Sequence, residues 1–283
     1  MLNASNIFTL LKSAEQILKS NNIPEPETDA EVLLADVLNV KRGQLPLIRT
    51  NPVGQDSFDK YKNYISKRIT RQPVAYILGK TEFMGLNFIV NEDVLIPRQE
   101  TEILVEEVLS RIKINKYSEI LDMCTGSGCI AVSVAKYANV CVTASDISLK
   151  AVDVARKNAE INNVSDRINF IAGDMFFNIP AKKFDIIVSN PPYIAEKEFN
   201  NLEKELSFEP RKALVADEDG LFFYRQIAQN SKKYLNQNGL IIVELNANIP
   251  ELITEIFSGA GYKKIKILND YAGLKRVLVT KNG

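Results

Sequence analysis

The chain has 283 residues, and its 35 lysines and arginines balance its 35 aspartates and glutamates. The length suits one large or two modest domains, and zero formal net charge argues against direct binding of nucleic acid through its phosphates. Histidine is absent, which excludes zinc sites with imidazole ligands and catalysis by an imidazole base, and we expect no metal. No apolar run approaches the roughly 20 residues of a membrane span and the first residues lack the order of a signal peptide, so we expect no membrane contact and a cytoplasmic location.

Residues 1–75 are predicted to form a small helical domain. Apolar residues recur at helical spacing in three stretches, 7–18, 30–38 and 58–69. Thr28 or Asp29 is expected to cap the second helix. No strand pattern interrupts this region.

Between residues 76 and 97 the pattern changes to short alternating runs. Tyr76-Ile77-Leu78 and residues 86–90 are strand-like, and Gly79 and Gly85 lie between them. This segment predicts a β-hairpin that links two domains.

Residues 98–283 alternate between helical and strand-like segments. After a helix at 103–112, strand-like runs occupy residues 119–123, 140–145, 168–172, 184–189 and 240–244, most of them followed by helices. Two further runs, 264–268 and 276–280, lie too close together for a helical crossover, so we expect them to pair antiparallel at one edge. The pattern predicts an α/β, Rossmann-like fold with a mostly parallel sheet and an antiparallel edge strand.

The loop after the first of these strands is a candidate nucleotide site. Cys124-Thr125-Gly126-Ser127-Gly128 turns into a helix that is expected to begin near residue 129, and its glycines let a ligand approach the backbone. Asp146 closes the next strand, where a carboxylate can bind both hydroxyls of a ribose. Asp174, after the third strand, could bind an adenine amino group, with Met175 or Phe176 against the ring. Asp122, near the end of the first strand, could bind a ligand amine or, equally, the amides of the neighbouring loop.

The same glycines also fit the dinucleotide fingerprint, so a nicotinamide dehydrogenase competes with other nucleotide-dependent enzymes. The loop after the strand at 184–189 decides against it. There Asn190, Pro191, Pro192 and Tyr193 form a stiff segment in which a side-chain carbonyl and a backbone carbonyl can accept both protons of a planar NH2 group. Tyr193 can lay its ring against that group. An ordinary turn is the alternative.

Taken together, these segments resemble the class I S-adenosylmethionine methyltransferases, and within them the PrmC/HemK family of protein glutamine methyltransferases. The resemblance covers nearly the whole chain. It is carried by RQPVAYILGKTEFMGLNF at 71–88, VLIPRQETEILVE at 94–106, LDMCTGSGCIAVSVA at 121–135, SDISLKAVDVARKNAE at 145–160, FDIIVSNPPYI at 184–194 and FEPRKALVADEDGL at 208–221.

The resemblance implies that the enzyme methylates the side-chain amide of the glutamine in the GGQ motif of peptide chain release factors. S-adenosyl-L-methionine would be bound by residues 124–128, Asp146, Asp174, Met175 and Asn190, and the catalytic segment would be Asn190 to Tyr193. Residues 1–75 would dock the protein substrate or serve only as a stabilising appendage, 76–97 would be the hairpin linker, and 98–283 would be the methyltransferase domain.

Other functions stay open at this point. A glutamine methyltransferase for a ribosomal protein, an amino-methyltransferase for nucleic-acid bases and a non-catalytic assembly factor would share parts of this pattern. The chain also departs from the family at Gln99, Cys124 and Met175, and in the segment Glu244-Leu245-Asn246. We expect these departures to alter cofactor affinity rather than abolish function.

Overall fold

The computed structural model describes residue 2, residues 6–217 and residues 219–282, with only the backbone described at Asn200. The chain divides into two compact units. The helical unit comprises Met1–Gly79 and Lys204–Phe208, and the α/β unit comprises Lys80–Glu203 and Glu209–Gly283. No helix within the described residues is long and apolar enough to cross a membrane.

The helical unit contains the helices α1 (Ile7–Ser20), α2 (Pro26–Val37), α3 (Gln55–Ile69) and α4 (Val74–Leu78), with 3-10 turns at Arg42–Ile48 and Lys204–Phe208. The prediction that Thr28 or Asp29 caps α2 is wrong. Pro26 begins this helix, because its missing N–H costs nothing in the first turn, and both predicted caps lie inside it.

Asp29 instead takes part in a buried ion-pair cluster. Its carboxylate accepts a hydrogen bond from Arg68 Nε at 2.6 Å. Arg68 and Arg71 each also donate to Glu205, at 3.0 and 2.8 Å. These pairs attach residues 204–208 to the helical unit, although they lie more than 120 positions beyond it in the sequence.

The hairpin follows α4. The strands β1 (Lys80–Phe83) and β2 (Leu86–Ile89) pair antiparallel, whereas Tyr76-Ile77-Leu78, predicted as a strand, is helical. Gly79 ends α4 with a φ of +71°, a conformation that glycine adopts without strain. The side chain of Asn158 anchors β2 by bonding both the N–H and the carbonyl of Ile89.

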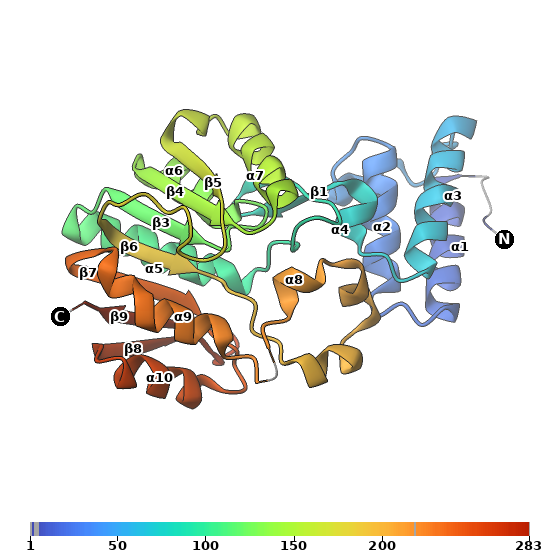
Figure 1. The fold of residues 1–283 in the computed structure, drawn as a ribbon. Helices are drawn as coiled ribbons and strands as arrows, with labels where there is room; N and C mark the ends of the chain where they lie inside the picture. Colours follow the sequence, from blue (N-terminus) through green and yellow to red (C-terminus); the bar gives the residue numbers. More distant parts are fainter. Residues whose placement is uncertain (1, 3–5, 218, 283) are drawn as a thin grey trace. The chain divides into compact units, whose positions relative to one another are not determined.

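A seven-stranded sheet forms the centre of the α/β unit, with the strand order β5-β4-β3-β6-β7-β9-β8 (Figure 1). Its strands are β3 (Glu119–Met123), β4 (Cys141–Asp146), β5 (Ile168–Ala172), β6 (Phe184–Ser189), β7 (Leu235–Glu244), β8 (Lys263–Asn269) and β9 (Lys275–Lys281). The first five are parallel, and β9 pairs antiparallel with β7 and β8. This arrangement confirms the predicted fold class.

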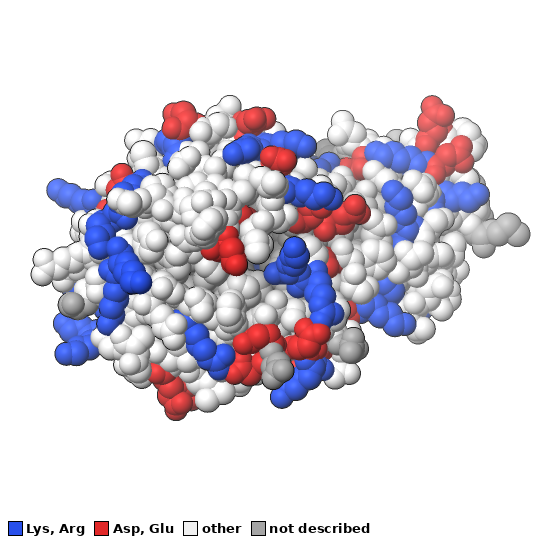
Figure 2. Space-filling view, viewed as in Figure 1, with Lys and Arg blue, Asp and Glu red and all other residues white. Residues whose placement is uncertain are grey.

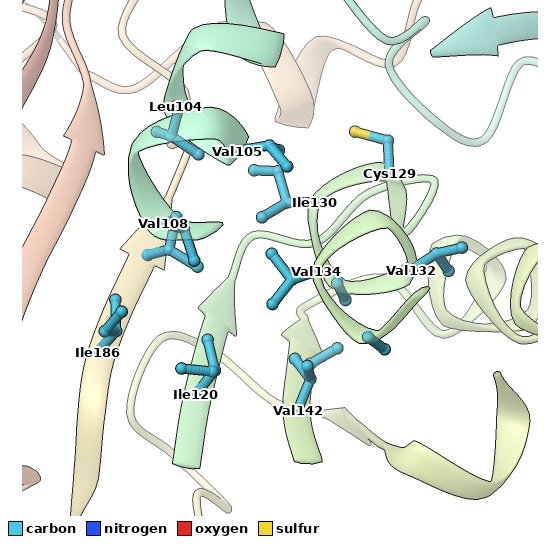
Figure 3. Packing of buried hydrophobic residues seen from close by; sticks show 14 of the residues in the cluster. Leu104, Val105, Val108, Ile120, Cys129, Ile130, Val132, Val134, Val142 and Ile186 are labelled. Carbon is cyan, nitrogen blue, oxygen red and sulfur yellow. The ribbon is translucent and has the colours of Figure 1, made fainter. Parts of the chain in front are cut away.

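Helices pack on both faces of this sheet. They are α5 (Glu100–Asn115), α6 (Cys129–Ala138), α7 (Leu149–Ile161), α9 (Phe222–Asn230) and α10 (Pro250–Gly259). The segment between β6 and α9 contains the short helix α8 (Arg211–Leu214), and 3-10 turns occupy Ser165–Arg167, Glu196–Asn201 and Ser231–Lys233. Successive strand residues alternate between the two faces. Ile120 and Ile186 face α5 and α6 (Figure 3), whereas Leu121 and Ile187 belong to the core that contains α9 and α10.

The chain reverses its direction of travel across the sheet at β3. From β3 it proceeds through β4 to β5, and it then returns to add β6 on the other side of β3. Ligands of open α/β sheets bind at such a point, outside the carboxyl ends of the strands. Met123 and Ser189 pair there, and the Ser189 hydroxyl donates to the Met123 carbonyl at 2.7 Å. The loops after β3 and β6 therefore begin side by side.

Candidate active site

A cavity of about 420 Å³ lies at this point, large enough for a small organic ligand. Predicted site residues from four strand ends line it: Cys124, Gly126, Asp146, Asp174, Met175, Asn190 and Pro192. The cavity is also lined by residues 92–95, by parts of residues 210–215 and by Phe223. Figure 2 shows acidic and basic side chains interspersed among the described residues of the face it draws.

The loop after β3 is held to the end of β4 by Asp146. One carboxylate oxygen of Asp146 accepts from the N–H of Gly126 at 2.9 Å, and the other accepts from the N–H of Ser148 at 2.9 Å. A carboxylate has about four acceptor positions, so Asp146 keeps acceptor capacity for a ligand. Gly126 has a φ of +53°, and a Cβ added there would meet no atom within 4 Å, so the cavity reaches the backbone itself.

Thr125, Ser127 and Gly128, the other predicted residues of this loop, are not among the residues that line the cavity, and their contacts hold the loop in place. The Thr125 hydroxyl donates to Asp122 Oδ2 at 2.6 Å, and the N–H of Ala131 donates to the same oxygen at 3.2 Å. Asp122 is fully buried, and this burial raises the pKa of its carboxyl to about 7. Of the two roles considered for Asp122, the contacts are those of a residue that bonds its own loop.

Ser127 and Gly128 connect the loop to its neighbouring helices. The Ser127 carbonyl accepts from the side chain of Asn158 at 2.9 Å. A Cβ at Gly128 would lie 2.9 Å from the Cβ of Ala155, so glycine permits α6 to pack closely against α7. Gly128 also has a φ of +79°, which disfavours any other residue.

The turn after β5 brings Asp174 and Met175 to the cavity, with Asp174 exposed and Met175 half-buried. Gly173 precedes them, and a Cβ there would lie 2.2 Å from the Phe177 carbonyl oxygen. Phe176, the alternative to Met175, stacks on Tyr234 with a centroid distance of 4.9 Å. The side chain of Phe176 thus packs in the core.

The loop after β6 supplies the remaining predicted residues. Asn190 and Pro192 line the cavity, and both prolines are buried. Asn190 Nδ2 donates to the hydroxyl of Thr101 at 3.2 Å. Tyr193 is anchored at two points: its hydroxyl donates to Glu244 Oε1 at 3.4 Å, and its carbonyl accepts from Asn246 Nδ2 at 3.3 Å. Asn246, one of the departures from the family pattern, therefore helps to hold this loop.

Glu244 connects the contacts behind the Asn190 loop. It is almost completely buried, and burial raises the pKa of its carboxyl to about 7. Its Oε2 accepts from the Thr101 hydroxyl at 2.7 Å. The sequence interpretation assigned no role to Thr101, which lies in the segment 94–106 that carried the resemblance, or to Glu244, which begins the segment where the chain departs from the family.

Several residues outside the predicted set also line the cavity. Ile147 follows Asp146 directly and leaves an apolar side chain 54% exposed at the cavity, and its position next to a strand end is the sequence signal that could have identified it. Residues 92–95 precede α5. Residues 210–215 contribute basic side chains at Arg211 and Lys212. The acidic side chains at the cavity are Glu92, Asp93, Asp146 and Asp174.

Comparison with known proteins identifies the family. The model of the PrmC N-terminal domain matches residues 9–79, and that of the methyltransferase small domain matches residues 99–267. The release factor glutamine methyltransferase of Clostridium acetobutylicum is 41% identical over 277 residues, which cover 96% of this chain and 97% of that protein. The chain belongs to the release factor glutamine methyltransferase family.

Further comparisons agree with this membership. The release factor glutamine methyltransferase of Thermodesulfovibrio yellowstonii is 39% identical to the chain, with 89% of this chain and 91% of that protein covered. A solved structure of a methyltransferase from Pyrococcus furiosus has a TM-score of 0.52 at 18% identity and covers 81% of this chain and 100% of that one. At that identity the likeness concerns the fold alone, which is that of a class I methyltransferase.

Proposed function

We propose that this protein transfers a methyl group from S-adenosyl-L-methionine to the side-chain amide nitrogen of the GGQ-motif glutamine in peptide chain release factors. One observation carries the proposal. Residues proposed to hold the cofactor, among them Gly126 and Asp146, line a single cavity together with Asn190 and Pro192 of the proposed catalytic segment. The 41% identical relative with almost full coverage supports the choice of substrate.

The hydrogen-bond acceptors, the open space and the charge of the cavity match what S-adenosylmethionine requires. Asp146 keeps acceptor capacity for the ribose hydroxyls, and the open space beside Gly126 admits a ligand against the backbone. Asp174 and Met175 would bind the adenine by its amino group and by apolar contact. The acidic residues at the cavity outnumber the basic ones, which suits a ligand with a positively charged sulfur. When bound, S-adenosylmethionine supplies a methyl group on a sulfonium sulfur that leaves readily.

Asn190 would orient the substrate amide. An amide nitrogen is a weak nucleophile because its lone pair is delocalised into the carbonyl. The side-chain carbonyl of Asn190 and the backbone carbonyl of Pro191 would accept the two N–H groups and thereby fix the direction of the nitrogen. Orientation of this kind can supply about 7–11 kcal/mol of the barrier reduction. Tyr193 would pack on the glutamine and exclude water, and the methylated nitrogen would lose its extra proton to solvent.

The helical unit is proposed to dock the release factor. A second cavity of about 230 Å³ lies within it, lined by Phe8, Leu11, Leu45 and Pro46 among others. Phe8 and Leu47, which follows Pro46 in the sequence, leave large apolar side chains exposed. A second contact surface would let the enzyme select one glutamine from all others, since selection depends on differences in binding free energy.

A labelled-methyl transfer assay tests the proposed function. The full-length protein is incubated with labelled S-adenosylmethionine and, separately, with release factor, release factor whose GGQ glutamine is replaced by alanine, ribosomal proteins, and DNA. We expect label in the unchanged release factor alone. Label in ribosomal protein or DNA, or equal label in the alanine variant, would contradict the proposal.

A further inference from the structure

We propose that Thr101 and Glu244 are positioning residues that fix which end of the Asn190 side-chain amide faces the substrate. This inference rests on the proposed function, because it concerns how Asn190 holds the glutamine amide. Thr101 is the second residue of α5, Glu244 ends β7, and Asn190 follows β6. The fold brings these three elements together behind the cavity.

The direction of the hydrogen bonds follows from counting protons. A threonine hydroxyl has one proton to donate and can accept in return. When Glu244 is ionised, the Thr101 hydroxyl gives this proton to Glu244 Oε2 at 2.7 Å, because an ionised carboxylate can only accept. Thr101 can therefore only accept from Asn190, and it does so from Nδ2 at 3.2 Å. The NH2 end of Asn190 is thus held toward Thr101.

The opposite end of the amide is consequently available as an acceptor. A substrate amide presents N–H donors, so an Asn190 side chain turned by 180° would oppose donor to donor and lose the interaction. The two ends of an asparagine amide have nearly the same shape, and packing alone cannot distinguish them. The Thr101–Glu244 pair supplies the distinction by chemistry.

Glu244 is itself held from several sides. Its second oxygen accepts from the Tyr193 hydroxyl, and its backbone carbonyl accepts from the Tyr224 hydroxyl at 2.9 Å. The titratable groups that face it are Glu100 on α5, Cys129 on α6, Tyr193, Tyr224 on α9 and Arg276 on β9. One buried carboxylate therefore serves both polar side chains of the Asn190 loop.

The decisive experiment compares two substitutions at one buried position. Thr101→Ser keeps the hydroxyl, whereas Thr101→Val keeps the shape and removes it. The kcat of methyl transfer to release factor and the Kd of S-adenosylmethionine are measured for both. We expect Thr101→Val to lower kcat about tenfold or more, which corresponds to one lost orienting bond, with Kd unchanged. Thr101→Ser should stay within about threefold of the unchanged protein.

Thr280→Val is the matched control. Thr280 is as buried as Thr101 but lies on β9, and its hydroxyl donates to the Lys263 carbonyl, away from the cavity in the strand order. It should leave kcat unchanged. Equal kcat values for the valine and serine variants of Thr101 would overturn the inference. A failure of the unchanged protein to methylate release factor would instead overturn the proposed function.

A second variant keeps the inference testable if Thr101→Val does not fold. The direction of the bonds requires an ionised Glu244, whose pKa is raised to about 7 by burial. The kcat should therefore rise with pH through about 7, and Glu244→Gln should lose this rise. A pH profile that is the same in the unchanged protein and in Glu244→Gln would contradict the positioning role.

Discussion

The loops after β3 and β6 are each backed by a buried carboxylate, but the two carboxylates are used differently. Asp122 accepts two hydrogen bonds on Oδ2, one from Thr125 in its own loop and one from Ala131 in the helix that follows. Its Oδ1 has no hydrogen-bond partner among the described residues. Glu244 uses both oxygens, and its partners are Thr101 and Tyr193. Asp122 thus shapes backbone, whereas Glu244 orients side chains.

This difference suits the two tasks proposed for the cavity. The proposed cofactor end consists mainly of Asp146 and of the backbone beside Gly126, so the loop has only to keep its shape. The substrate end depends on one amide side chain, and an amide can be turned the wrong way. Changes at the two ends should therefore separate binding of the cofactor from transfer of the methyl group.

The largest effect is expected for Asn190→Ala. Losing the side-chain acceptor should lower kcat by at least about 10²–10³-fold, as the loss of one preorganised group in other active sites does. Cofactor binding should change little. Steady-state kinetics and calorimetric titration with S-adenosylmethionine measure the two quantities. Weaker binding of S-adenosylmethionine with an unchanged kcat would reverse the roles assigned to the two ends of the cavity.

Asp146→Ala is expected to give the opposite pattern. Its carboxylate holds Gly126 and Ser148 and would also bind the ribose, so the Kd of the cofactor should rise about 10²-fold, equivalent to one or two charge-assisted hydrogen bonds. At saturating cofactor, kcat should recover. An unchanged Kd would remove Asp146 from the binding site.

Asp122→Asn should change the pH dependence of stability without changing kcat. Burial raises the pKa of Asp122 to about 7 from 3.8, so the unfolded chain loses this proton at a lower pH than the folded protein does. The Asp122 contribution to the free energy of unfolding is therefore greatest below about pH 4 and declines as pH rises to about 7. Asparagine cannot titrate, so the variant should gain stability relative to the unchanged protein across this window.

Urea denaturation at several pH values measures this gain, whose limit is about 1.4 kcal/mol per pH unit. Glu244→Gln should show a similar gain in stability relative to the unchanged protein, because Glu244 is buried in the same way. The two variants should differ in the pH profile of kcat, which only Glu244→Gln should alter. If Asp122→Asn also altered that profile, the contrast between the two carboxylates would fail.

The smallest effect is expected outside the cavity. Leu47→Ser changes a side chain of the helical unit that is 83% exposed, so it should raise KM for release factor a few-fold and leave kcat and the cofactor Kd unchanged. Leu252→Ser on α10 is the matched control, because Leu252 is an exposed leucine of the α/β unit. Equal KM values for the two variants would count against docking by this surface.

Much of the α/β fold could be predicted from sequence because buried parallel strands are continuous apolar runs. The bounds of β3, β5 and β6 agree with the prediction at both ends. The short apolar run Tyr76-Ile77-Leu78 was assigned wrongly, since three residues carry no period that distinguishes a strand from one helical turn.

The site was predictable only in part, and for a physical reason. Residues next to a strand end, such as Asp146 and Asn190, can be placed at the cavity from the parallel order of the sheet alone. The bond between Thr101 and Glu244 joins positions 143 residues apart, on a helix and a strand whose rotation about their axes no local pattern specifies. The attachment of residues 204–208 to the helical unit likewise depends on bonds between positions far apart in the sequence, those of Arg68 and Arg71 with Glu205.

A crystal structure of the full-length protein with S-adenosylhomocysteine and a release factor would test the account most directly. It should place the glutamine amide nitrogen within hydrogen-bond distance of Asn190 Oδ1 and the Pro191 carbonyl, with Asn190 Nδ2 still bonded to Thr101. A glutamine bound elsewhere, or an Asn190 amide that donates to the substrate instead of accepting from it, would contradict the account.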